Sequence, residues 1–128
     1  MAHTSNEGIP FNTMPSIYWD DHVKISYLQR RIIVYSIMYY ERDESCVSDR
    51  QYDMISQQLV HLQSSVDEEE FKKSTYYYVM YDFDGSTGFH LYSRLNKKDK
   101  EWLGRIADMV YKQWKNDTTP EQRKEALR

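Results

Sequence analysis

Residues 39–53 read YYERDESCVSDRQYD, and this stretch marks the junction between two predicted helices. Ser48, with Gln51 three residues later, is a capping-box pattern in which each side chain accepts a hydrogen bond from the other residue's backbone N–H. A helix is therefore expected to begin just after Ser48, with Asp49 in its first turn, where a carboxylate is favourable. The segment Glu41–Val47 before it is a short charged loop. Two helices joined by so short a loop are expected to pack as an antiparallel pair.

Apolar and aromatic residues on both sides of this junction recur at helical spacing. The first helix is expected to begin near Asp20 or Asp21, whose carboxylates suit a first turn, and to run to about Tyr40. The second is expected to end near Ser65. The apolar stripes are Ile25, Leu28, Ile32, Tyr35 and Tyr39 in the first helix, and Tyr52, Ile55, Leu59 and Leu62 in the second.

The C-terminal half of the chain predicts a different kind of secondary structure. Two runs rich in strand-forming residues, Tyr76–Tyr81 and Phe89–Tyr92, flank the turn-rich stretch Asp82–Gly88. This arrangement is typical of a β-hairpin. Asn96 can then cap a long helix. The expected fold class is therefore α+β, with an antiparallel helix pair, a β-hairpin and a long C-terminal helix.

The chain is short enough to form one domain. Residues 1–18 contain two prolines and no periodicity, and we expect a flexible N-terminal arm there. Residues 19–115 are expected to form the single α+β domain. Residues 116–128 are predicted to be a charged C-terminal tail, in which Thr119-Pro120 is a further helix start because proline is tolerated at the first helical position.

Composition excludes several classes of function. The 128 residues include 17 Lys+Arg against 20 Asp+Glu, a net charge of −3, whereas a nucleic-acid-binding protein would show a strong basic surplus. No apolar run approaches the roughly 18 residues of a membrane span, and no signal peptide is visible. A single cysteine, Cys46, allows no internal disulfide. We therefore expect a soluble cytoplasmic protein that binds neither nucleic acid nor membrane.

One stretch suggests an enzyme. Residues 76–86 read YYYVMYDFDGS, and an apolar strand followed by Asp-x-Asp-Gly-Ser resembles the opening motif of the haloacid-dehalogenase phosphatases. The resemblance would make Asp82 a nucleophile and Asp84 a general acid/base. That family needs a doubly wound α/β domain, for which too few residues follow Ser86. A loop in which Asp and Gly supply turn conformations is favoured instead, and we expect no catalytic residues.

No metal site is expected. Asp82, Asp84 and Ser86 lack the glycine position, distal glutamate and flanking helices of a calcium-binding EF-hand loop. The residues that most often bind transition metals are scattered along the chain without ligand spacing: His22, Cys46, His61 and His90.

The junction itself carries the most specific resemblance. The pattern Tyr-[His/Tyr]-x-x-Asp, followed by Asp-x-x-Tyr-Asp at the start of a second helix, resembles the N-terminal helical subdomain of bacterial NAD-dependent DNA ligases. The resemblance covers roughly residues 28–63. It implies a pocket for the nicotinamide mononucleotide half of NAD, with the contacts falling on Tyr39, Tyr40, Asp49, Tyr52 and Asp53. Tyr40 departs from the family, which usually has histidine there. The adenylation motif, zinc finger and helix-hairpin-helix module of a ligase are absent from the sequence.

The residue types suit such a ligand independently of the resemblance. The nicotinamide ring of NAD is a pyridinium cation, and a tyrosine face attracts a cation by roughly 0.5–2 kcal/mol. The carboxylates of Asp49 and Asp53 can accept hydrogen bonds from ribose hydroxyls or from a carboxamide. However, Tyr39 and Tyr52 also belong to the apolar stripes of the two helices. The pattern therefore fits both a nucleotide pocket and a helix-pair scaffold without a ligand.

Two non-catalytic functions are consistent with these features. In one, the protein senses or sequesters an NAD-derived nucleotide, with NAD or a related mononucleotide as ligand. In the other, it is a phage-like accessory protein or inhibitor that binds a host protein, or itself, through the aromatic hairpin. Both faces of that hairpin would be apolar or aromatic, whereas a sheet covered on one side should be polar on the other. The predicted interface residues are Tyr76, Tyr77, Tyr78, Val79, Tyr81, Phe89 and Tyr92.

Overall fold

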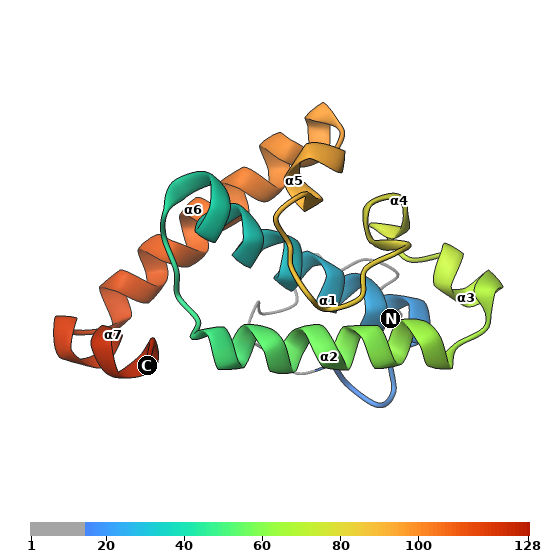
Figure 1. Cartoon of the computed structure of the whole chain (residues 1–128), viewed down its shortest axis with the longest axis horizontal. Coiled ribbons are helices and arrows are strands. Elements are labelled where there is room, and N and C mark those ends of the chain that lie inside the picture. Colours follow the sequence, from blue (N-terminus) through green and yellow to red (C-terminus); the bar gives the residue numbers. More distant parts are fainter. Residues whose placement is uncertain (1–14) are drawn as a thin grey trace.

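The computed structural model describes residues 15–128, and these are 70% helix with no strand (Figure 1). The predicted N-terminal arm, residues 1–18, lies mostly outside the described residues. No described helix is long and apolar enough to cross a membrane. The elements are α1 (Asp21–Ser36), a π-helical turn η1 (Ile37–Glu41), α2 (Asp49–Ser65), α3 (Glu68–Lys72), α4 (Tyr77–Met80), α5 (Leu91–Arg94), α6 (Lys97–Asp117) and α7 (Pro120–Ala126).

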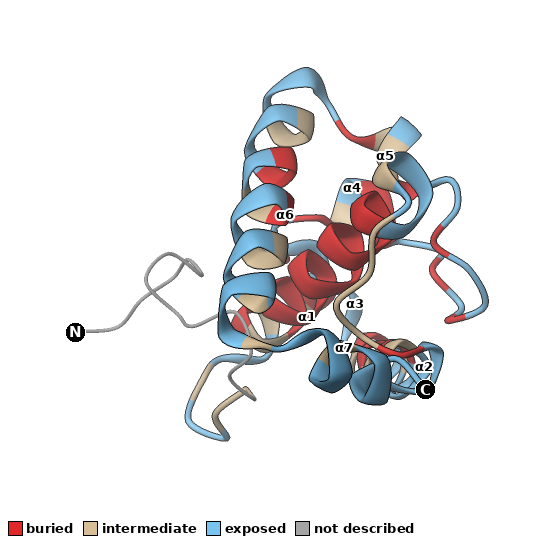
Figure 2. Cartoon of the chain, turned by 90° about the vertical axis from the view of Figure 1, so that its left-hand side faces the viewer, coloured by how far each residue is buried: buried red, intermediate tan, exposed pale blue. Residues whose placement is uncertain are grey.

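Helix α1 is the centre of the molecule (Figure 2). Its apolar side chains Ile25, Leu28, Ile32 and Ile33 are fully buried because α2, α3, α5 and α6 all pack against it. A helix covered on most sides must also bury polar groups, and these need partners. Gln29 is such a group: its amide donates to Gln63 and Ser74 at 3.0 Å each and accepts from the backbone N–H of Tyr76 at 3.1 Å. This network ties α1 to α2 and to the segment that precedes α4.

The predicted helix pair is confirmed. Helices α1 and α2 run in opposite directions (Figure 1) and are joined through η1 and a short loop. The capping box is present, since Ser48 Oγ accepts from the Gln51 N–H at 3.2 Å and Gln51 Oε1 accepts from the Ser48 N–H at 3.1 Å. After η1, Asp43 adopts a φ of 50°, a left-handed conformation that aspartate tolerates better than most side chains. This conformation of Asp43 ends the helix and turns the chain towards α2.

The predicted β-hairpin is wrong, and with it the α+β fold class, because the described residues contain no strand. The runs expected to be strands instead contain the short helices α4 and α5, separated by an irregular segment. The burial pattern gives the reason: Tyr76, Val79, Met80 and Phe83 are buried, a spacing of three to four residues, whereas a strand would bury alternate residues. The aromatic content that favours strands is overridden here by packing against α1 and α2.

The C-terminal helices begin at the predicted caps. Asn96 Oδ1 accepts from the Asp99 N–H at 2.7 Å at the start of α6. Thr119 and Gln122 form a second capping box before α7, which lies in the stretch predicted to be a charged tail. Helix α6 packs on α1 through the buried residues Leu103, Gly104 and Ala107.

Candidate functional site

A cavity of about 280 Å³ lies where η1, the first turns of α2 and the segment between α4 and α5 meet. All five residues predicted to bind a nucleotide line it, together with residues that the sequence did not single out. The full lining is Tyr35, Ser36, Tyr39, Tyr40, Ser45, Val47, Ser48, Asp49, Tyr52, Asp53, Ser86 and Thr87. The volume is close to the lower end of the roughly 300–1,000 Å³ typical of small-molecule sites.

The first wall of the cavity comes from η1. A π-helical turn inside or after an α-helix is frequently found at functional sites. Here it carries Tyr39 and Tyr40, which are 57% and 38% exposed although the preceding sixteen-residue helix α1 is almost entirely buried. Their rings meet edge to face, with centroids 4.9 Å apart and planes at 81°. Two tyrosine rings are therefore held at right angles beside an open cavity.

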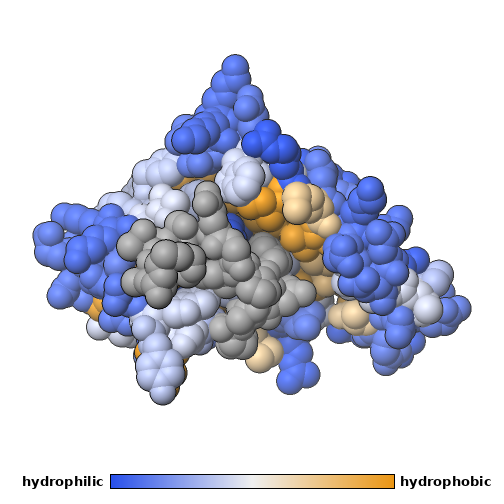
Figure 3. All heavy atoms as spheres, turned by 180° about the vertical axis from the view of Figure 1, so that it is seen from behind, coloured by the Kyte–Doolittle hydropathy of each residue, from blue (hydrophilic) through white to orange (hydrophobic). Residues whose placement is uncertain are grey.

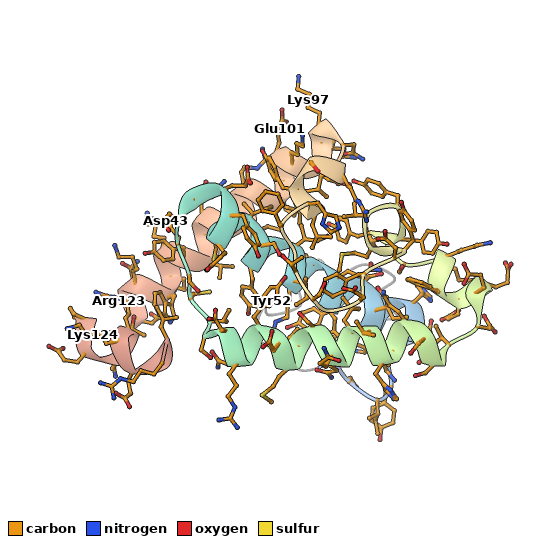
Figure 4. The ribbon with its side chains drawn as sticks, in the orientation of Figure 1. Asp43, Tyr52, Lys97, Glu101, Arg123 and Lys124 are labelled. Atoms are coloured by element: carbon orange, nitrogen blue, oxygen red, sulfur yellow. The ribbon has the colours of Figure 1, made fainter. Side chains whose placement is uncertain are left out.

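The second wall comes from the start of α2. Asp49, Tyr52 and Asp53 are spaced three and four residues apart, so they share one face of the helix. Tyr52 projects from α2 (Figure 4), and its hydroxyl lies 3.1 Å from Ser36 Oγ on α1, a contact that fixes the position of the ring. Burial raises the pKa of Tyr52 above its usual value, and the phenol stays protonated at neutral pH. Asp49 and Asp53 are exposed.

The third wall is the segment between α4 and α5, which contributes Ser86 and Thr87. The Tyr40 hydroxyl lies 3.0 Å from Thr87 Oγ1, and the Tyr40 and Phe89 rings pack edge to face at 5.4 Å. Two glycines let this segment lie close to the helix pair. Gly85 has a φ of 85°, and a Cβ on Gly88 would stand only 2.1 Å from Ser36 Oγ and 2.5 Å from the Tyr52 hydroxyl.

Sequence reasoning missed Ser86 and Thr87 because it assigned them to a hairpin turn. The signal that could have found them is the spacing of Gly85 and Gly88, since glycines three residues apart in a polar loop also mark a close approach to another part of the chain. Ser36 on α1, Ser45 in the loop and Ser48 at the N-cap of α2 also line the cavity. The sequence marks Ser48 as a helix cap, but nothing in it marks any of the three as part of a binding site.

The hairpin that was expected to carry the aromatic interface is absent from the described residues. Tyr76 and Val79 are buried in the core, and Tyr77 and Tyr92 are partly buried against it. The remaining three predicted residues, Tyr78, Tyr81 and Phe89, are exposed but do not form a sheet face. A two-sided apolar sheet was the reason for predicting self-association or a host-protein partner, and that reason is lost.

The Asp82 and Asp84 pair serves the local structure. Asp82 is held by the Arg94 guanidinium at 2.6 and 3.1 Å, which keeps the pKa of that carboxyl below its usual value. Asp84 Oδ1 accepts from the N–H and Oγ of Ser86 at 2.9 and 2.6 Å, an Asx-type turn. Neither aspartate lines the cavity. Among residues 15–128, no group of three or more His, Cys, Asp and Glu side chains is arranged to hold a metal ion.

A second, more open cavity of about 800 Å³ lies between the 46–47 loop and the C-terminal half of α6. Its apolar lining includes Val47, Met109 and Val110, and Figure 3 shows apolar side chains exposed among hydrophilic ones on the face opposite to that of Figure 1. Cys46 also lines this cavity, and burial raises its pKa to about 11. The thiol is therefore protonated at neutral pH and is not a reactive nucleophile.

No protein-family model matches this chain, and no curated protein or solved structure does so either.

Proposed function

We propose that this protein binds an NAD-derived nucleotide by its nicotinamide end, in the cavity formed by η1, α2 and the segment containing Ser86 and Thr87, without catalysing a reaction on it. One observation carries the proposal: the five residues singled out by their resemblance to the nicotinamide-binding subdomain of NAD-dependent DNA ligases all line one cavity.

The aromatic groups support a ring-binding site. Tyr39 is more than half exposed beside the cavity, Tyr40 is exposed to a smaller extent, and Tyr52 forms part of its wall. A pyridinium ring that stacks on one of these faces gains roughly 0.5–2 kcal/mol from the cation–π interaction, in addition to the burial of apolar surface. The site is too small for a whole dinucleotide, and its volume suits a nucleoside-sized part of one.

The carboxylates supply the polar contacts that such a ligand needs. Asp49 and Asp53 are acceptors on the rim of the cavity, and the ribose hydroxyls and the carboxamide NH2 of a nicotinamide nucleoside are donors. Hydrogen bonds to a charged acceptor contribute about 1.5–3 kcal/mol each. Together with one stacked ring, these contacts are consistent with micromolar to millimolar affinity.

In this proposal the protein sequesters or senses the nucleotide. A small phage-like accessory protein or inhibitor that removes an NAD-derived signal of a host defence system would need no catalytic group. In this role Asp49 and Asp53 act as hydrogen-bond acceptors for the ligand and not as nucleophiles.

The experiment is titration calorimetry of the full chain with nicotinamide mononucleotide, NAD and cyclic ADP-ribose. We expect the mononucleotide to bind, and Tyr39→Ala to weaken its binding about 2- to 30-fold, the range of one cation–π contact. Tyr18→Ala is the matched control, because that ring is 90% exposed and does not line the cavity. Affinity weaker than about 1 mM for both nicotinamide mononucleotide and NAD would rule the proposal out, and so would binding of cyclic ADP-ribose alone, because that compound has no nicotinamide.

A further inference from the structure

The charged side chains that line the cavity are all negatively charged. Its lining contains two carboxylates, Asp49 and Asp53, and no lysine or arginine. Within residues 15–128, neither carboxylate takes part in a hydrogen bond or salt bridge of the structure. Two unpaired anionic groups therefore face the space that a ligand would occupy.

The basic residues nearest in sequence are directed elsewhere. Arg42 follows η1 directly, but its guanidinium pairs with Asp108 on α6 and lies against Gly104 of the same helix. Arg50 is exposed and does not line the cavity, and it forms no salt bridge with Asp49 or with Asp53, three residues further along the helix. Neither arginine lines the cavity.

Most hydroxyl groups of the lining are already engaged within the protein. Ser36 Oγ donates to the Ile32 carbonyl at 2.8 Å, and Ser45 Oγ donates to the Val47 carbonyl at 2.7 Å. Ser48 Oγ is used in the capping box, and Ser86 Oγ donates to Asp84 at 2.6 Å. These groups are poorly placed to form the cluster of donors with which proteins usually hold a phosphate.

We infer that the site selects a cationic pyridinium nucleoside and leaves the phosphate of the ligand in solvent. This inference rests on the proposed function. It specifies the part of the nucleotide that is recognised and the redox form that is preferred. A phosphate placed between Asp49 and Asp53 would be repelled, whereas a pyridinium ring is attracted by both carboxylates and by the tyrosine faces. Dihydronicotinamide is neutral and loses both attractions, so the oxidised form is preferred over the reduced form.

The test is calorimetry of the full chain with four ligands: nicotinamide riboside, nicotinamide mononucleotide, reduced nicotinamide mononucleotide, and nicotinic acid riboside. We expect the riboside to bind within about twofold of the mononucleotide, because the phosphate contributes no contact. The reduced mononucleotide should bind at least about tenfold more weakly than the oxidised one, since it lacks the positive charge. Nicotinic acid riboside should also bind more weakly, because its carboxylate faces Asp49 and Asp53.

Single substitutions distinguish the effect of the carboxylate charge from a change in the fold. Asp49→Asn and Asp53→Asn keep the size of an exposed side chain, and each should weaken the oxidised form more than the reduced form, because both forms lose a hydrogen bond but only the oxidised form loses a charge attraction. Glu101→Gln removes one carboxylate from the exposed face of α6, well away from Tyr52 (Figure 4), and should leave the preference intact. Raising the salt concentration should weaken the oxidised ligand more than the reduced one.

Two results would overturn the inference while leaving the proposed function standing. One is tenfold or greater loss of affinity on removing the phosphate, which would show that the phosphate is bound. The other is equal affinity for oxidised and reduced mononucleotide. If none of the four ligands binds, the proposed function fails, and the inference fails with it.

Discussion

Substituting Gly88 by alanine tests how the segment between α4 and α5 is attached to the helix pair. An added Cβ would stand 2.1 Å from Ser36 Oγ and 2.5 Å from the Tyr52 hydroxyl, whereas ordinary contact begins at 3.4 Å. Ser36 is buried and its hydroxyl is bonded to the Ile32 carbonyl, so it cannot move aside easily. The backbone around position 88 must therefore move away from Ser36 and Tyr52 until the added Cβ reaches ordinary contact distance.

We expect Gly88→Ala to lower the free energy of unfolding by about 1–3 kcal/mol, the usual cost of overpacking a well-packed site. In urea denaturation followed by circular dichroism, this corresponds to a midpoint lowered by about 1 M with an unchanged slope. The displaced segment carries Ser86 and Thr87 away from the cavity, so the affinity for nicotinamide mononucleotide should fall as well.

The effect should be relieved when the clashing atoms are removed. In a Ser36→Ala, Tyr52→Phe background, both hydroxyl oxygens are gone and the closest remaining atom is Ser36 Cβ at 3.1 Å. Gly88→Ala should then cost less than in the wild type, a coupling that a double-mutant cycle measures directly. Gly104→Ala is the control: its Cβ would meet only the end of the flexible Arg42 side chain at 3.1 Å, and alanine is favoured over glycine in a helix by about 1 kcal/mol. A Gly88→Ala protein within about 0.5 kcal/mol of the wild type would refute the reasoning.

Three further predictions concern the helix contacts. Gln29→Met leaves the buried N–H of Tyr76 without its acceptor and should lower the unfolding free energy by about 2–4 kcal/mol in urea denaturation, while a loss below about 1 kcal/mol would contradict the role of the network. Ser48→Ala removes the N-cap of α2 and should cost about 1 kcal/mol, measured in the same way, with no change expected if the cap were frayed. Hydrogen bonds from the His22 ring and from the His22 backbone N–H lower the pKa of Glu70 from the usual 4.5 to about 2. Ionised Glu70 therefore stabilises the fold above pH 4.5, and this stabilisation is lost as the pH falls towards 2. Thermal unfolding of Glu70→Gln should therefore depend less on pH in that window than the wild type does, and parallel pH profiles would count against the pair.

The helix pair could be predicted from the sequence because its signals are local. The capping boxes of Ser48 with Gln51 and of Thr119 with Gln122 each join residues three apart in the sequence. The side-chain cap formed by Asn96 on the Asp99 N–H spans the same distance. Such patterns are satisfied within one turn of helix. They do not depend on which other elements pack nearby.

The hairpin could not be excluded by the same means. Tyrosine and valine favour strands mainly because they fit a half-buried pleated surface, and no such surface exists around α4. Val79 and Met80 instead lie on the four-residue helix α4, which places both side chains in the core, fully buried. Gly85 and Gly88, which suggested a turn, allow the backbone to approach α2 and the end of α1.

The candidate site was predictable to the extent that it lies on the helix pair. Asp49, Tyr52 and Asp53 share one helix face and Tyr39 and Tyr40 precede the loop, so the motif alone brings them near each other. Ser86 and Thr87 reach the cavity only through tertiary packing of a segment whose two flanking runs were wrongly predicted to be strands. The third wall of the site was therefore beyond what the sequence could indicate.

The most direct test of the central claim is an isotope-filtered NMR measurement of contacts between nicotinamide mononucleotide and the labelled protein. We predict nuclear Overhauser effects from the nicotinamide ring protons to the aromatic protons of Tyr39 and Tyr52, and none to Trp114 in the cavity beside α6. The absence of contacts to Tyr39 and Tyr52 at saturating ligand, or contacts to Trp114 instead, would contradict the claim that the nicotinamide end binds between η1 and α2.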